Sequence, residues 1–175
     1  MDKPILFSAE MVRAILDGRK TMTRRLNKQW LKVKKGDRLW VRETWRHVSP
    51  TKDSTSAWIN YKASPNALFR ISDGDFDSDD IIFHAPHEWE PSIFMPRWAS
   101  RITLEATADA RLERLQEITV ENAKAEGVTP VGVEGDGRRW RGGFRDLWDF
   151  LNPKAPWKNN PEVVVIEFKK CAPKS

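Results

Sequence analysis

The sequence predicts a mainly β, mixed α+β fold in which short strands form a small barrel flanked by a few short helices. Apolar and polar residues alternate over 38–45 and 101–107, which is typical of strands. Three consecutive valines within 162–168 indicate a final strand that is buried on both faces. Helical spacing of apolar residues is confined to three short segments: 8–17, 119–126 and 144–152.

The domain organisation follows from length and local composition. A chain of 175 residues is long enough for one buried domain, so we expect a single domain over 1–175. Residues 49–94 are predicted to be an insertion, because they contain one probable strand at 57–61 and the acidic run 73–80. The Gly- and Arg-rich segment 131–143 is predicted to be a mobile loop beside an anionic ligand.

Composition favours a polyanionic partner and narrows the class of protein. Thirty Lys and Arg residues against 25 Asp and Glu give a net charge of +5. The nine tryptophans suit core packing, and the same side chain also stacks on nucleobases. The single Cys171 excludes an intrachain disulfide framework. Because neither a signal peptide nor an apolar run of about 20 residues is present, we expect a cytoplasmic protein without membrane contact.

A dense basic segment follows the first helix. Residues 18–25 hold four cations and two hydroxyls after Gly18, which suits the left-handed residue that ends a helix. If the extended chain relaxes its alternation, Lys20 and Thr23 approach each other, and a desolvated lysine can act as a base. A solvated basic turn and a phosphate-binding loop are the alternatives.

Several other side chains are candidates for the same site. Glu126 ends the helix over 119–126, where the helix dipole disfavours a carboxylate unless a cation such as Lys20 lies opposite. A surface position for this acid is the simpler alternative. Glu43 falls on the apolar face of a strand and needs a partner there. We therefore take Glu43 as a substrate-binding candidate, although a surface acid near the strand end is an equally good interpretation.

The adjacent pair Arg97–Trp98 offers a cation beside an indole. This combination suits stacking on a base together with a phosphate contact, so both residues are predicted to bind substrate. Packing of Trp98 against the wall of the fold is the alternative. His84 and His87, with distant His47, do not complete a convincing metal site, and no metal or cofactor is implied.

Four separated segments, in this order, resemble the ASCH domain family, a β-barrel related to the PUA RNA-binding domain. They are the sequences GRKTMTRR at 18–25, GDRLWVRE at 36–43, ITVENAKAEGV at 118–128 and VVVIEF at 163–168. The segments 95–104 and 144–152 resemble the larger, phage- and prophage-associated members. The resemblance implies a PUA-like barrel that binds RNA or a modified nucleoside.

Small bacterial ASCH proteins that the chain resembles are N4-acetylcytidine amidohydrolases. Their GxKxxTxR motif falls on Gly18, Lys20, Thr23 and Arg25, and their glutamate aligns with Glu126. The resemblance implies that Lys20 is the base, Thr23 the nucleophile and Glu126 the residue that orients or relays the proton. Arg25 would hold the substrate or the developing oxyanion. A non-catalytic RNA-binding module and a ribonuclease that uses the same cleft remain the alternatives.

Overall fold

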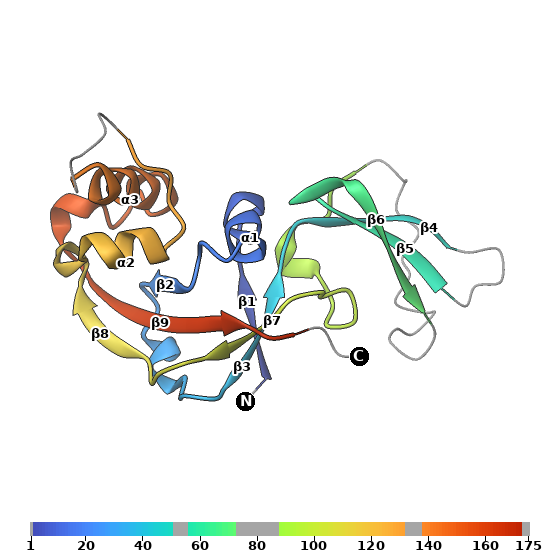
Figure 1. Cartoon of the computed structure of the whole chain (residues 1–175), viewed down its shortest axis with the longest axis horizontal. Helices are drawn as coiled ribbons and strands as arrows, with labels where there is room; N and C mark the ends of the chain where they lie inside the picture. The colour runs from blue at the N-terminus through green and yellow to red at the C-terminus, as the bar shows by residue number, and fades with distance from the viewer. Residues whose placement is uncertain (1, 51–55, 73–87, 132–137, 173–175) are drawn as a thin grey trace. The chain divides into compact units, whose positions relative to one another are not determined.

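The computed structural model describes residues 2–50, 56–72, 88–131 and 138–172 (Figure 1). The fold is mixed α+β and consists mostly of strands with few helices, which confirms the predicted fold class at this level. By internal contacts the chain divides into two compact units, with boundaries inside α1, β3 and β7. Among the described residues, unit 1 holds 14–38 and 104–171, and unit 2 holds 2–13, 39–103 and 172.

Strand β9 (Glu162–Lys170) organises unit 1. It pairs antiparallel with β2 (Met22–Arg25), β7 (Thr103–Ala106) and β8 (Arg111–Arg114). In Figure 1 β9 is a long curved ribbon, and the sheet around it curls like part of a barrel. The three valines that predicted this strand, at 163–165, are fully buried.

Two helices complete unit 1. Helix α2 (Val120–Ala125) begins after Thr119, whose side chain accepts a hydrogen bond from the Asn122 backbone N–H, as expected for an N-cap. Helix α3 (Arg138–Leu151) buries Phe144 and Trp148. These two side chains join a core formed by Leu115, Ile118, Ala123, Val128 and Val163.

Helix α3 corrects the prediction of a mobile loop over 131–143. Residues 138–143 are helical, and residues 132–137 lie outside the described part of the chain. The glycines serve close packing: a Cβ at Gly143 would collide with the Thr129 carbonyl oxygen, and one at Gly142 would lie 3.1 Å from Val131 Cγ2. Glycine at 142 and 143 therefore lets the helix approach the chain that precedes it.

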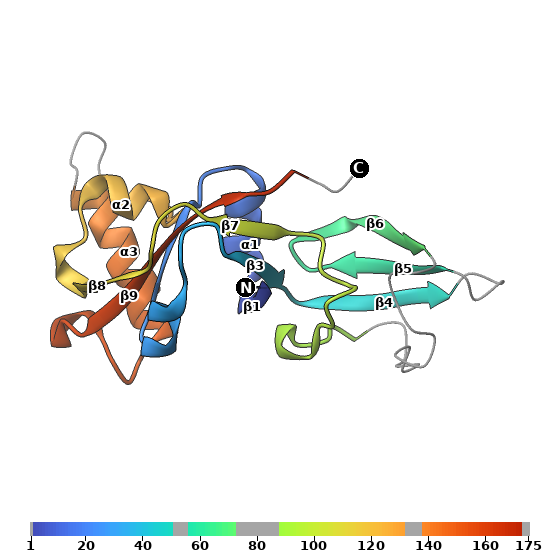
Figure 2. The same cartoon turned by 90° about the horizontal axis from the view of Figure 1, so that it is seen from below.

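Unit 2 contains a separate three-stranded antiparallel sheet, in the order β4-β5-β6 (Figure 2). Its strands are β4 (Trp45–Pro50), β5 (Ser56–Tyr61) and β6 (Ser64–Ser72). Two of the three lie inside the segment 49–94 that was predicted to be an insertion. Trp45, Ile59, Tyr61, Met95 and Ala99 form the core cluster of this unit.

The remaining elements are short. Strand β1 (Asp2–Leu6) pairs with β3 (Arg38–Arg42), and helix α1 (Ala9–Leu16) follows β1. The 3-10 helices are η1 (Lys28–Lys32), η3 (Ser92–Phe94), η4 (Leu115–Glu117) and η5 (Trp157–Asn159). Within the described ranges, none of the helices has the length and apolar character needed to cross a membrane. His84, His87 and the acidic run 73–80 lie outside those ranges.

Candidate active site

Local backbone chemistry places the basic segment next to the end of α2. Gly18, at a φ of +75°, lets the chain leave α1 abruptly, as predicted. The backbone N–H groups of Arg19 and Lys20 then donate to the Ala14 carbonyl oxygen, at 2.9 Å each. Lys20 forms an isolated antiparallel bridge with Glu126, and β2 begins two residues later. The extended segment therefore runs directly beside the last residue of the α2 turn.

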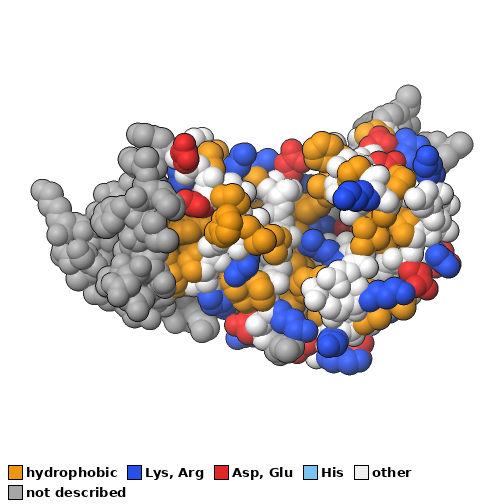
Figure 3. All heavy atoms as spheres, turned by 180° about the vertical axis from the view of Figure 1, so that it is seen from behind, with side chains coloured by type: hydrophobic (Ala, Val, Ile, Leu, Met, Phe, Trp, Pro, Cys, Tyr) orange, Lys and Arg blue, Asp and Glu red, His pale blue; other side chains and the backbone are white. Residues whose placement is uncertain are grey.

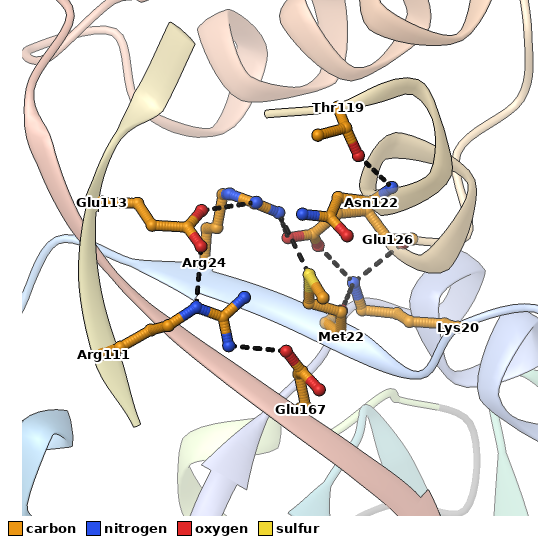
Figure 4. Close-up of polar contacts among 9 residues, drawn as sticks. All are labelled: Lys20, Met22, Arg24, Arg111, Glu113, Thr119, Asn122, Glu126 and Glu167. Atoms are coloured by element: carbon orange, nitrogen blue, oxygen red, sulfur yellow. Dashed lines mark hydrogen bonds and ion pairs between the residues drawn. The ribbon is translucent and has the colours of Figure 1, made fainter. Parts of the chain in front are cut away.

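Lys20 and Glu126 form a buried ion pair (Figure 4). The Lys20 ammonium donates to Glu126 Oε2 at 2.8 Å, to the Glu126 carbonyl oxygen at 2.8 Å and to the Met22 carbonyl oxygen at 2.9 Å. Lys20 is only 2% exposed and Glu126 only 5%. The cation expected opposite the helix C-terminus is therefore present, and the surface alternative for Glu126 is wrong.

Arg24 is a member of this cluster that the motif did not identify. Its Nη1 donates to Glu126 Oε1 at 3.1 Å, and its Nη2 donates to Glu113 Oε2 at 2.9 Å. Both carboxylate oxygens of Glu126 thus accept a hydrogen bond from a cation, one from Lys20 and one from Arg24. The signal was available in the alternation of an extended chain, which directs residues 20, 22 and 24 to one side.

The ion pairs continue across three strands of unit 1. Glu113 on β8 also accepts a hydrogen bond from Arg111 Nε at 2.8 Å. Arg111 in turn donates to Glu167 on β9 (Figure 4). The side chain of Arg24 is fully buried, whereas that of Arg111 is 40% exposed. The network therefore connects the buried Glu126 carboxylate to the solvent-exposed side of the sheet.

Burial affects the pKa of two cations near Glu126, Lys20 and Arg25. Burial lowers the pKa of Lys20, although the neighbouring Glu126 carboxylate opposes that change. Burial likewise lowers the pKa of Arg25. Lys20, Arg24 and Arg25 bring three positive charges to this region, and Glu113 and Glu126 bring two negative ones.

Thr23 lies in β2, where it is opposite Ile166 of β9 and only 3% exposed. Strand alternation turns its side chain away from the face that carries Met22 and Arg24. The structure therefore brings together the predicted amine and acid, and it places the predicted nucleophile, Thr23, on the other face of β2. The role of Thr23 stays a prediction.

Glu43 has the partner that its position required. Both of its carboxylate oxygens accept hydrogen bonds from Arg101, at 2.9 and 3.0 Å, and Glu43 is 1% exposed. The Arg101 guanidinium also lies over the Tyr61 ring, at 4.1 Å. Burial raises the pKa of Glu43, and the ion pair with Arg101 opposes that rise. This second buried pair lies within unit 2, and substrate binding by Glu43 stays a prediction.

Arg97 and Trp98 differ in their surroundings. Trp98 is half-buried and packs edge-on against Trp45, with ring centroids 5.7 Å apart. This matches the wall-packing alternative, so base stacking by Trp98 stays a prediction. Arg97 is exposed, lies over the Trp40 ring at 5.5 Å and approaches Asp2 at 3.4 Å.

Neither a metal site within the described residues nor a match to a known family was found. Within the described ranges, no group of three or more His, Cys, Asp and Glu side chains could hold a metal ion. Searches of the chain against protein-family models, curated proteins and solved structures found no match. The resemblance to the ASCH family therefore stays a prediction based on the four segments quoted above.

Proposed function

We propose that the chain is a PUA-like protein of the ASCH type that binds RNA or a nucleoside and hydrolyses the N4-acyl group of a modified cytidine. One observation supports the proposal most directly. Lys20 and Glu126 lie 106 positions apart in sequence, yet their charged atoms are 2.8 Å apart in a buried site. These are the two charged residues that the motif resemblance pairs, and Glu126 is also an acid placed unfavourably at a helix end.

The proposed reaction is acyl transfer through a covalent ester. The step requires the extended segment to relax its alternation so that Thr23 approaches Lys20. Neutral Lys20 then takes the proton of the Thr23 hydroxyl as Thr23 Oγ bonds to the acyl carbon. The bond from the acyl carbon to N4 then breaks, and Lys20 returns the proton to the departing amine. Water hydrolyses the Thr23 ester, releasing the carboxylic acid and restoring the hydroxyl. Cytidine and acetate are the products when the acyl group is acetyl.

The surroundings suit this chemistry in two respects. The lowered pKa of Lys20 raises the fraction of neutral amine near neutral pH, which a base requires. Arg25, the cation that the resemblance assigns to the oxyanion, would stabilise the negative charge that develops on the acyl oxygen. Arg24 also holds Glu126 in place, because it donates to Oε1, the carboxylate oxygen that Lys20 does not bind.

The test is release of cytidine from N4-acetylcytidine, measured chromatographically. Thr23→Val keeps the volume of the side chain but removes the hydroxyl, so we expect a loss of about 10³-fold or more in turnover. The matched control is Thr21→Val, at an exposed position two residues earlier, which should retain activity. Equal turnover by Thr23→Val and the wild type, or no turnover by the wild type, would refute the amidohydrolase assignment.

A non-catalytic RNA-binding module is the second candidate, and one observation favours it. All three ammonium hydrogens of Lys20 are already directed at protein oxygens, as expected of a structural ion pair. In that case the wild type should bind RNA with an affinity that falls steeply as salt rises, because phosphate contacts release counterions. It should release no cytidine from the acylated nucleoside.

A further inference from the structure

We propose that unit 2 carries a binding surface for single-stranded RNA, formed by Trp40, Arg42, Ile93, Phe94 and Arg97. We call these five residues the Arg–Trp platform. All of them belong to unit 2, so the surface is separate from the Lys20–Glu126 site of unit 1. The inference rests on the proposed function for its ligand class. It makes that function more specific, because it names single-stranded RNA, and not a free nucleoside, as the ligand.

Two guanidinium groups share one indole on this platform. Arg42 lies over the Trp40 ring at 4.7 Å, and Arg97 lies over it at 5.5 Å. Trp40 itself is only 7% exposed, so its ring serves mainly as a support for the two cations. A guanidinium that is already stacked loses less conformational entropy when it binds a phosphate.

Exposed apolar side chains lie directly beside these cations. Phe94 is 69% exposed and Ile93 is 56% exposed, both on the short helix η3. Arg42 Nη1 donates to the Ile93 carbonyl oxygen at 2.9 Å, which ties η3 to the stacked arginine. The platform therefore presents a free aromatic face next to cations, the combination on which an unpaired base stacks while its phosphate is bound.

Charge favours RNA over an apolar protein partner. Arg97 pairs with Asp2 at 3.4 Å, and both side chains are about half exposed, so a phosphate can replace this weak pair. The same Arg-on-Trp arrangement recurs nearby, where Arg46 lies 4.5 Å over the Trp89 ring. An RNA strand supplies a phosphate for each arginine, whereas a free nucleoside supplies no phosphate.

Net charge alone would not locate this surface. On the face of the molecule in Figure 3, Lys and Arg side chains are interspersed with apolar ones and several acidic ones, without one dominant basic patch. The platform is distinguished by geometry: two stacked guanidinium groups and one exposed phenyl ring.

The experiment uses the full chain and a fluorescein-labelled, single-stranded RNA of about 12 nucleotides, long enough to cross one such surface. Fluorescence anisotropy gives the affinity at about 50 mM and about 200 mM salt. We expect Phe94→Ala to weaken binding by about 10-fold, the loss of one stacked base. Arg97→Gln should weaken binding and reduce the salt slope by about 1. The matched control is Phe150→Ala in unit 1, a phenylalanine that is 81% exposed, which should bind normally.

Each outcome decides the matter. Wild-type affinity in both Phe94→Ala and Arg97→Gln, or no RNA binding by the wild type, overturns the platform. Self-association that Phe94→Ala abolishes, with unchanged RNA affinity, assigns the surface to a second copy of the chain and also overturns it. Turnover of N4-acetylcytidine is measured on the same samples. Turnover without RNA binding removes the platform alone, whereas platform-dependent binding without turnover removes the amidohydrolase alone.

Discussion

Replacing Lys20 with methionine should destabilise unit 1 far more than a typical loss of one surface charge. The Lys20 ammonium donates to one carboxylate oxygen and two backbone carbonyl oxygens, all at 2.8–2.9 Å. Methionine fills nearly the same volume, so the change removes the charge and its hydrogen bonds without opening a large cavity. Glu126 then stays buried and keeps its ion pair with Arg24.

The expected magnitude follows from burial. Removing one member of a buried ion pair costs about 3–5 kcal/mol, because the other charge is left desolvated. For a protein of this size that corresponds to a decrease of about 6–20 °C in melting temperature. Native domains have total stabilities of about 5–15 kcal/mol, so the variant should remain folded but marginal.

Urea unfolding monitored by tryptophan fluorescence measures this change as a shift in midpoint at constant slope. The matched control is Lys28→Met, because the Lys28–Glu162 pair has the same 2.8 Å separation but is 63% and 41% exposed. We expect it to cost less than about 1 kcal/mol. Equal effects of Lys20→Met and Lys28→Met would refute the reasoning, since burial would then contribute nothing to the strength of the pair.

Three further predictions concern backbone packing and proton binding. In thermal unfolding, Gly143→Ala should destabilise by several kcal/mol because its Cβ would collide with a backbone carbonyl oxygen. Gly142→Ala should cost much less, because its Cβ would meet only the end of the Val131 side chain and alanine favours a helix; similar melting temperatures would contradict this. Gly127→Ala should lower the melting temperature clearly more than Gly18→Ala. Both glycines have positive φ, but only at Gly127 would a Cβ lie 2.7 Å from the Lys20 Cβ. Equal decreases in melting temperature would argue against that crowding. Burial lowers the pKa of Lys20 below 10.5, so Lys20 binds its proton more tightly in the unfolded chain than in the folded one. Between the folded-state pKa and 10.5, Lys20 therefore makes the free energy of unfolding rise with pH. Urea midpoints from about pH 7 to about pH 10 should show this rise in the wild type and lose it in Lys20→Met.

Local rules were sufficient for several elements of the fold. The left-handed conformation of Gly18 depends on neighbours within a few residues and was correctly predicted. The strands β3 and β9 were predicted because the apolar–polar alternation over 38–45 and the three consecutive valines within 162–168 are local sequence patterns. The start of α3 was missed, because the use of Gly143 there depends on contact with Thr129, which its own composition does not reveal.

The candidate site was predictable only in part, for a related reason. The unfavourable position of Glu126 at a helix end required a cation, and the motif supplied Lys20 as that cation. Alternation placed Arg24 on the same face, but its second partner, Glu113, is 89 positions away in the sequence. Such a long-range pair follows from how β8 joins β9, and that register is not encoded in either segment alone.

Because the Lys20 ammonium also donates a hydrogen bond to the Glu126 backbone, the two residues of this ion pair are not interchangeable. Lys20 donates to the carbonyl oxygen of Glu126, the residue directly after α2, as well as to its carboxylate, so it fixes the position of the helix end. An exchanged pair, Lys20→Glu with Glu126→Lys, would restore opposite charges but place an acceptor where a donor is required. Charge reversal should therefore fail to rescue the fold, and substitutions at these two positions should be constrained by geometry as much as by sign.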